Sequence, residues 1–122
     1  MSSRFQFINH KGKRIFYVDF KGIEIDEVWE VLEAAKQVIA RQPMKSVRHL
    51  TDVTGTVFSK RTIRELKAYA NHNEPFIHRS AAIGVSGIMV VMFNAVVKFS
   101  KRKNLVLKRS REEALDWLAE DE

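Results

Sequence analysis

The chemistry-bearing residues of this sequence are concentrated in a polar turn near its middle. Ser59 is of the type that caps a helix, and Lys60 and Arg61 follow it where the first helical turn is expected. Cations in a first turn are unfavourable by roughly 0.3 to 1 kcal/mol each, because the helix dipole is positive there. Two interpretations stay open. Either Arg61 pairs with Glu65 one turn later while Lys60 extends into solvent, or the free amides and both cations bind a phosphate, a carboxylate or an acidic partner.

Two further polar residues follow predicted strands, at the end where α/β folds place ligands. Asp52 closes a short β-leaning run, and Ser86 occupies the equivalent turn after the next strand. Their types would suit acid–base or nucleophilic chemistry, but the sequence supplies no convincing pair of base and nucleophile, so we expect Asp52 to bond turn amides. The turn at 84–87 also lacks the glycine pattern of a dinucleotide site and the lysine of a phosphate loop.

An apolar run at residues 88–99 follows this turn and is predicted to be a helix. It is too short to span a bilayer, which takes about 20 apolar residues. Both of its sides are apolar, although an outer helix of a layered fold needs one apolar face. The second side therefore requires cover from a partner, an apolar ligand or a neighbouring helix. The residues expected on this interaction or ligand face are Met89, Met92, Phe93, Val96 and Val97.

Charge is distributed unevenly towards the C-terminus of this basic chain, whose net charge is +6 and whose isoelectric point is near 9.8. A basic edge begins at Lys98 and continues with Lys101, Arg102 and Lys103, whereas acids gather after Arg111. We do not expect a nucleic-acid partner, because no aromatic residue lies between Lys101 and Arg111 to stack on bases. The basic edge is predicted to be a solvated surface that allows peripheral contact with an anionic membrane.

Several classes of chemistry are excluded by residue type. The chain has no cysteine, which excludes disulfides, thiolate metal sites and cysteine nucleophiles and favours a cytoplasmic location. Its first residues lack the apolar core of a signal peptide. The histidines do not have the one-turn spacing that directs two imidazoles at one metal, so no metal site and no cofactor are predicted. They are His10, His49, His72 and His78.

A regular alternation of predicted elements positions these residues. The expected order is strand, strand, helix, strand, helix, strand, helix, strand, helix, and the 122 residues fit one domain, 1–122. The predicted ranges are 5–9, 14–20, 25–39, 47–53, 60–73, 80–85, 88–99, 104–107 and 111–118. Alternation after the opening hairpin implies right-handed crossovers onto one sheet. The expected fold class is an α/β layered sandwich in which helices pack on a mixed, mostly parallel sheet.

This element order, together with three segments, resembles the SpoIIAA-like family of bacterial domains. The segments are HLTDVTGTVFSKRTIRELKAYA, AAIGVSGIMVVMFNAVVKFS and SREEALDWLAE. The family is related to the STAS domains of anti-sigma factor antagonists and, more distantly in fold, to CRAL-TRIO lipid-transfer domains. In STAS antagonists, a serine in an Asp-Ser-Ser-Gly turn is phosphorylated to control partner binding. The corresponding turn here, Phe58 to Thr62, lacks that pattern, so Ser59 and Thr62 are the candidates for such a switch.

Two classes of function are predicted, and neither is enzymatic. The first is a non-catalytic interaction or regulatory module of STAS-like type. It would act as a homodimer or with another protein through the apolar helix 88–99 and the cationic helix N-terminus 59–62. The second is a carrier or sensor of a small apolar or lipid-like anionic ligand. In that case the apolar helix would line the pocket, and the basic edge would meet the anionic head group.

Overall fold

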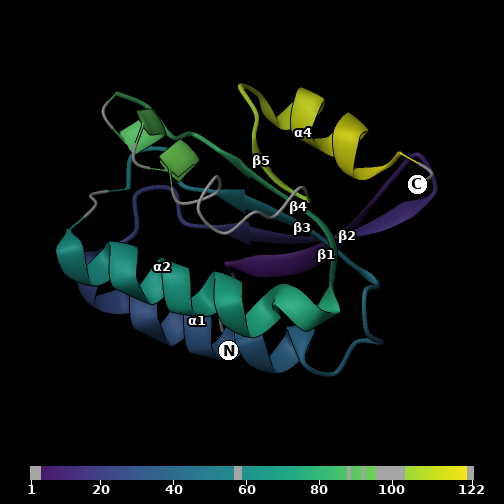
Figure 1. The fold of residues 1–122 in the computed structure, drawn as a ribbon, viewed down its shortest axis with the longest axis horizontal. Coiled ribbons are helices and arrows are strands. Elements are labelled where there is room, and N and C mark those ends of the chain that lie inside the picture. Colours follow the sequence, from purple (N-terminus) through teal and green to yellow (C-terminus); the bar gives the residue numbers. More distant parts are fainter. Residues whose placement is uncertain (1–3, 57–58, 88, 92, 96–103, 121–122) are drawn as a thin grey trace.

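A five-stranded mixed sheet organises the chain (Figure 1). The computed structural model describes residues 4–56, 59–87, 89–91, 93–95 and 104–120. The strands lie side by side in the order of the sequence, β1-β2-β3-β4-β5. Their bounds are β1 Phe5–His10, β2 Lys13–Asp19, β3 Val47–Asp52, β4 Ile77–Ile83 and β5 Leu105–Leu107.

The first two strands form an antiparallel hairpin, and every later pair of neighbours is parallel. The hairpin turn uses Lys11 and Gly12, whose φ angles are 52° and 80°. Positive φ at both central positions matches the twist of the flanking strands. The sheet is therefore mixed and mostly parallel, as the sequence predicts.

Helices cover both faces of this sheet (Figure 1). The helices α1 (Ile25–Ile39) and α2 (Lys60–Asn73) pack side by side on one face, and the short turn η1 (Glu74–Phe76) follows α2. The helix α4 (Arg111–Leu118) packs on the opposite face against β3 and β4. Because a helix returns the chain between parallel strands, α1 and α2 both begin at the carboxyl edge of the sheet.

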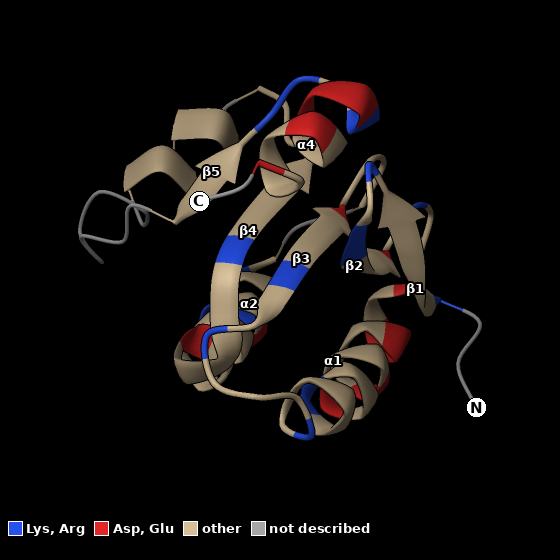
Figure 2. Cartoon of the chain, turned by 90° about the vertical axis from the view of Figure 1, so that its right-hand side faces the viewer, with Lys and Arg blue, Asp and Glu red and all other residues tan. Residues whose placement is uncertain are grey.

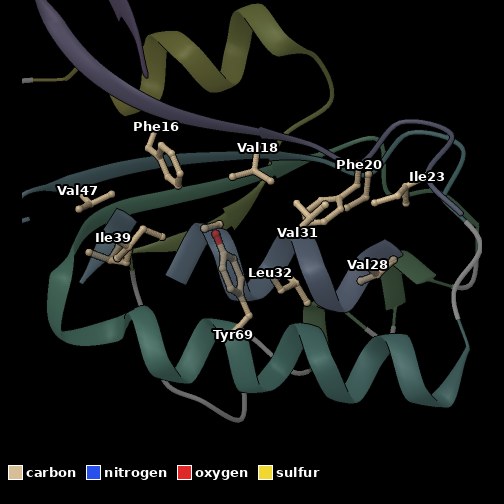
Figure 3. Packing of buried hydrophobic residues seen from close by; sticks show 13 residues of the cluster. Phe16, Val18, Phe20, Ile23, Val28, Val31, Leu32, Ile39, Val47 and Tyr69 are labelled. Atoms are coloured by element: carbon tan, nitrogen blue, oxygen red, sulfur yellow. The ribbon is translucent and has the colours of Figure 1, made fainter. Parts of the chain in front are cut away.

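The larger hydrophobic core lies between the sheet and the two neighbouring helices (Figure 3). Phe16 and Val18 point to this side at alternate positions of β2, and they meet the buried stripe of α1 that includes Leu32 and Ile39. Tyr69 of α2 enters the same cluster with its hydroxyl towards the sheet. Full burial of an aliphatic or aromatic side chain stabilises a fold by roughly 1.5 to 3 kcal/mol. These contacts therefore hold both helices on the sheet.

A smaller core fills the other face. Ile15, Tyr17 and Leu50 project from β2 and β3, and they pack with Ala114 and Leu118 of α4. The alternation of β2 between its two faces thus supplies both cores.

Two neighbouring arginines of the sheet hydrogen-bond to the C-terminal end of α4. Arg48 and Arg79 are register partners on β3 and β4, and Figure 2 shows a basic position on each of these strands. Arg48 donates to the backbone oxygens of Leu118 and Glu120, and Arg79 donates to the backbone oxygen of Trp117 at 2.6 Å. The last carbonyls of a helix lack helical partners and carry partial negative charge. These otherwise unpaired carbonyls explain why guanidinium groups occupy two adjacent strand positions.

The predicted order of elements is confirmed, with one strand displaced. The strand predicted at 80–85 is observed at Ile77–Ile83. It starts earlier because Ile77 pairs with Val47, and it ends earlier because Gly84 has a φ of 85°. Of the helix predicted at 88–99, residues 89–91 and 93–95 are helical and the others lie outside the described residues. Within the described part of the chain, no helix is both long enough and apolar enough to cross a bilayer.

Candidate functional site

The parallel strands end at one edge of the sheet, and a groove of about 1150 Å³ lies there. The turns after β2, β3 and β4 and the segment between β5 and α4 form its walls. Its polar and charged lining residues are Lys21, Asp52, Thr54, Ser86, Asn94, Lys108, Arg109, Ser110 and Arg111. The structure therefore brings Asp52 and Ser86, the two turn residues singled out in the sequence, to one groove.

Asp52 is buried and is engaged by its own turn. Its Oδ1 accepts from the amide of Thr54 at 3.0 Å and from the hydroxyl of Thr54 at 2.6 Å, while its Oδ2 lies 3.9 Å from Nζ of Lys21. The charge of Asp52 also acts on the phenol of Tyr17. Burial, followed by the charges of Asp19 and Asp52, raises the pKa of Tyr17, so the phenol keeps its proton. The bond to the Thr54 amide is the turn contact expected from the sequence.

The turn after β4 approaches the turn after β3 closely. A Cβ atom at Gly84 would lie 2.2 Å from Oγ1 of Thr54 and 2.4 Å from its backbone nitrogen. Gly84 also has a φ of 85°, a backbone conformation that residues other than glycine rarely adopt. Glycine is therefore required on both counts, and Ser86, two residues later, is exposed in the groove.

The first turn of α2 is capped as its sequence predicts. Oγ of Ser59 accepts from the amide of Thr62 at 3.1 Å, and the two hydroxyl oxygens are 3.0 Å apart. Thr62 is only 1% exposed. Arg61 donates to Glu65 at 2.8 Å, so the local pairing of this cation is confirmed. Lys60 is exposed at the start of the helix.

The described residues of the apolar helix divide between an exposed and a partly buried side. Val91 is 68% exposed, and Ala95 is exposed as well. Met89 and Phe93 are partly buried, and Phe93 lines a cavity together with Tyr69. The predicted site residues that lie outside the described part of the chain are Met92, Val96, Val97, Lys98, Lys101, Arg102 and Lys103.

The cavity beside Phe93 has a volume of about 70 Å³, and a buried pair, His49 and Tyr69, contributes to its wall. Nε2 of His49 lies 2.6 Å from the hydroxyl of Tyr69, and Nδ1 lies 3.1 Å from the backbone oxygen of Phe16. Nδ1 therefore donates to the carbonyl, and Nε2 accepts from the phenol. Burial lowers the pKa of His49 to about 4 and raises the pKa of Tyr69, so both side chains are neutral near pH 7.

Two solved structures are similar to this chain over nearly its whole length. One is the crystal structure of an uncharacterized protein of the DUF3478 family with a SpoIIAA-like fold from Shewanella loihica PV-4. It has a TM-score of 0.73 and 15% sequence identity, and the match covers 98% of this chain and 99% of that chain. The other is an anti-sigma-factor antagonist (STAS) domain protein from Planctomyces limnophilus. Its TM-score is 0.64 and its identity 15%, over 95% of this chain and 98% of that one.

The chain has the SpoIIAA-like fold. The resemblance predicted from the sequence is thereby confirmed at the level of architecture, including the mixed sheet and its helices. No family model and no curated protein matches the sequence.

The sequence does not predict the buried polar contact between His49 and Tyr69 in this SpoIIAA-like fold. In the sequence, His49 falls on a predicted strand and lacks the spacing of a metal ligand, and nothing near Tyr69 indicates a polar role. Residues 49 and 69 are 20 positions apart, so their contact depends on how α2 packs against β3. The available signal was a histidine within an apolar strand, which needs a buried partner for each ring nitrogen.

Proposed function

We propose that this chain is a non-catalytic interaction or regulatory module whose contact surface combines the first turn of α2 with the helical residues 89–91 and 93–95. STAS-like architecture supports this class of function, since the Planctomyces limnophilus protein is described as an anti-sigma-factor antagonist domain. The start of α2 and the helical residues after β4 lie at the same end of the molecule (Figure 1). A partner that contacts one of them is therefore close to the other.

The observation that carries the proposal is the exposure of Val91. An apolar side chain that is 68% exposed, on a helix whose other side is partly buried, is suited to burial against a partner. Exposed Lys60 adds a positive charge at the same end of the molecule, which favours an acidic rim on that partner. We expect the partner to be a second copy of this chain or another protein.

A non-catalytic role is supported by the contacts that Asp52 makes in the groove. Catalysis by Asp52 would need a free carboxylate oxygen near a nucleophile. Its Oδ1 instead holds the amide and hydroxyl of Thr54, and its Oδ2 faces Lys21. Asp52 thus stabilises the conformation of the turn.

The test is the molar mass of the purified protein, measured by light scattering after size exclusion. We expect a dimer, and Val91→Glu should convert it to a monomer by placing a charge in the apolar contact. Met44→Glu is the matched control, because Met44 is 64% exposed and lies after α1, away from the carboxyl edge. If the native protein is a monomer, the homodimer is excluded. A dimer that both variants preserve would place the contact elsewhere.

A second candidate function, carriage of an apolar ligand, has the cavity beside Phe93 in its favour. Its lining is mostly apolar and includes Leu66, Val53 and Ala82. The volume of about 70 Å³ is far below the roughly 300 to 1000 Å³ of small-molecule sites. An acyl chain would fit only if the helix that carries Phe93 moved away. Solvent extraction and mass spectrometry of the purified protein distinguish the functions, since a carrier should release a stoichiometric lipid.

A further inference from the structure

The groove at the carboxyl edge of the sheet is lined by cations that are not part of the proposed contact surface. Four of its lining residues are cations, Lys21, Lys108, Arg109 and Arg111. Among the lining residues that the structure describes, Asp52 is the one acid, and its own turn engages it. The acids in the first turn of α4 are not part of this lining. The groove therefore has an excess of positive charge.

Part of the groove is apolar. Its apolar lining includes Ile83, Val85, Val90 and Leu107. Its volume of about 1150 Å³ is slightly above the roughly 300 to 1000 Å³ of small-molecule sites, so a small ligand has room in it. An apolar wall with a few charged groups at one side is the usual composition of a site for an organic ligand that carries one charged group.

Arg111 is held in position before any ligand arrives. Its guanidinium carbon lies 4.6 Å from the centroid of the Tyr17 ring, and Tyr17 is itself buried. Arg109 is exposed two residues earlier, directly before the α4 cap Ser110. A stacked guanidinium loses less freedom on binding, and its planar fork matches a carboxylate or a phosphate.

We propose that this groove binds a small organic anion, whose carboxylate or phosphate group is held by Arg109 and Arg111 and whose apolar body rests on Val90 and Leu107. The occupant is distinct from the partner protein proposed above. The site is also separable from that contact, because Val91 is not among the groove residues. Val91→Glu should therefore abolish dimerisation and leave anion binding unchanged.

Nitrogen-15 NMR titration of the full chain at fixed ionic strength tests the site with three probes of equal chain length: octanoate, octyl phosphate and neutral 1-octanol. We expect both anions to shift the amides of Ser86, Asn94 and Leu107, and to bind at least about tenfold more tightly than octanol. The ratio of affinities for octanoate and octyl phosphate identifies whether a carboxylate or a phosphate is preferred.

The test pair and the control pair of substitutions remove the same amount of positive charge. Arg109→Gln with Arg111→Gln should weaken anion binding by roughly tenfold or more, and Arg109→Gln alone by less. The control pair Arg64→Gln with Lys67→Gln removes the same charge from exposed positions of α2 outside the groove. Three results would overturn the proposal: octanol binding as tightly as octanoate, shifts centred on Tyr69 and Leu66, or an equal effect of the control pair.

Discussion

Nε2 of His49 and the phenol of Tyr69 are joined by a hydrogen bond of 2.6 Å that links the central strand β3 to α2. Both residues are buried, and the second ring nitrogen of His49 is bonded to the backbone oxygen of Phe16. The bond therefore ties the helix that carries Ser59 and Lys60 to the interior of the sheet. Removal of this hydrogen bond should therefore lower the free energy of unfolding before it affects any other property.

Tyr69→Phe should lower the free energy of unfolding by roughly 1 to 3 kcal/mol, because the buried acceptor Nε2 of His49 is left without a donor. Urea unfolding followed by circular dichroism measures the loss. Tyr17→Phe is the matched control on the opposite face, where Asp52 keeps its two bonds from Thr54. We expect a smaller loss for that variant. Equal losses would show that the His49 bond has no special weight.

Stability should decrease as the pH falls from about 6.5 to about 4. Burial lowers the pKa of His49 to about 4 in the folded chain, against 6.5 when it is exposed. Between these values the unfolded chain binds more protons, so acidification favours unfolding, by roughly 3 kcal/mol over the whole window. Urea unfolding at a series of pH values measures the slope.

His49→Gln should flatten this slope, since glutamine does not titrate. Asp116 provides a separate signal at lower pH. Hydrogen bonds from His10 and Lys11 lower the pKa of Asp116, so its contribution to stability is lost only as the pH falls below 3.8. A slope between pH 4 and 6.5 that survives in His49→Gln would assign it to another group.

Gly84→Ala should destabilise the protein far more than Gly87→Ala. Both glycines have positive φ, so each alanine carries a conformational penalty of roughly 1 kcal/mol. At Gly84 the new methyl group would also overlap Thr54, whereas at Gly87 no described residue beyond its chain neighbours lies within 4 Å of the new methyl group. Thermal unfolding of the two variants should show a clear gap in midpoint temperature. Similar midpoints would mean that the two turns can separate without loss.

Arg48→Met should loosen the C-terminal end of α4, because the backbone oxygens of Leu118 and Glu120 lose their donor. We expect amide exchange in α4 to accelerate about tenfold, which corresponds to the weight of one or two charged hydrogen bonds. Exchange in α1, on the opposite face of the sheet, is the internal control. Arg48→Lys should rescue only part of the protection, since lysine lacks the planar fork.

Much of this fold can be predicted from local pattern. The stripe from Val28 to Ile39 predicts α1, and Ser59 and Ser110 predict the starts of α2 and α4, because each of these signals acts within a few residues. The pairing of Arg61 with Glu65 is foreseeable for the same reason.

Features that depend on register could not be predicted in this way. The early start of β4 depends on Ile77 reaching Val47, and the contact between Gly84 and Thr54 depends on two turns meeting. The groove itself joins residues from Lys21 to Arg111. No pattern within one segment encodes such distances, so the sequence predicts the candidate site only in part, through Asp52 and Ser86.

The order of the strands in the sheet, identical to their order in the chain, has a consequence for how the protein reaches its native state. Each strand can dock beside the strand that precedes it, so no segment has to wait for a distant part of the chain. Folding rates rise when contacts are close in sequence, because less loop entropy is lost before each contact forms. The hairpin of β1 and β2 can therefore serve as a template, with the later strands added one after another. The three-residue strand β5 then comes last, and α4 seals the second face.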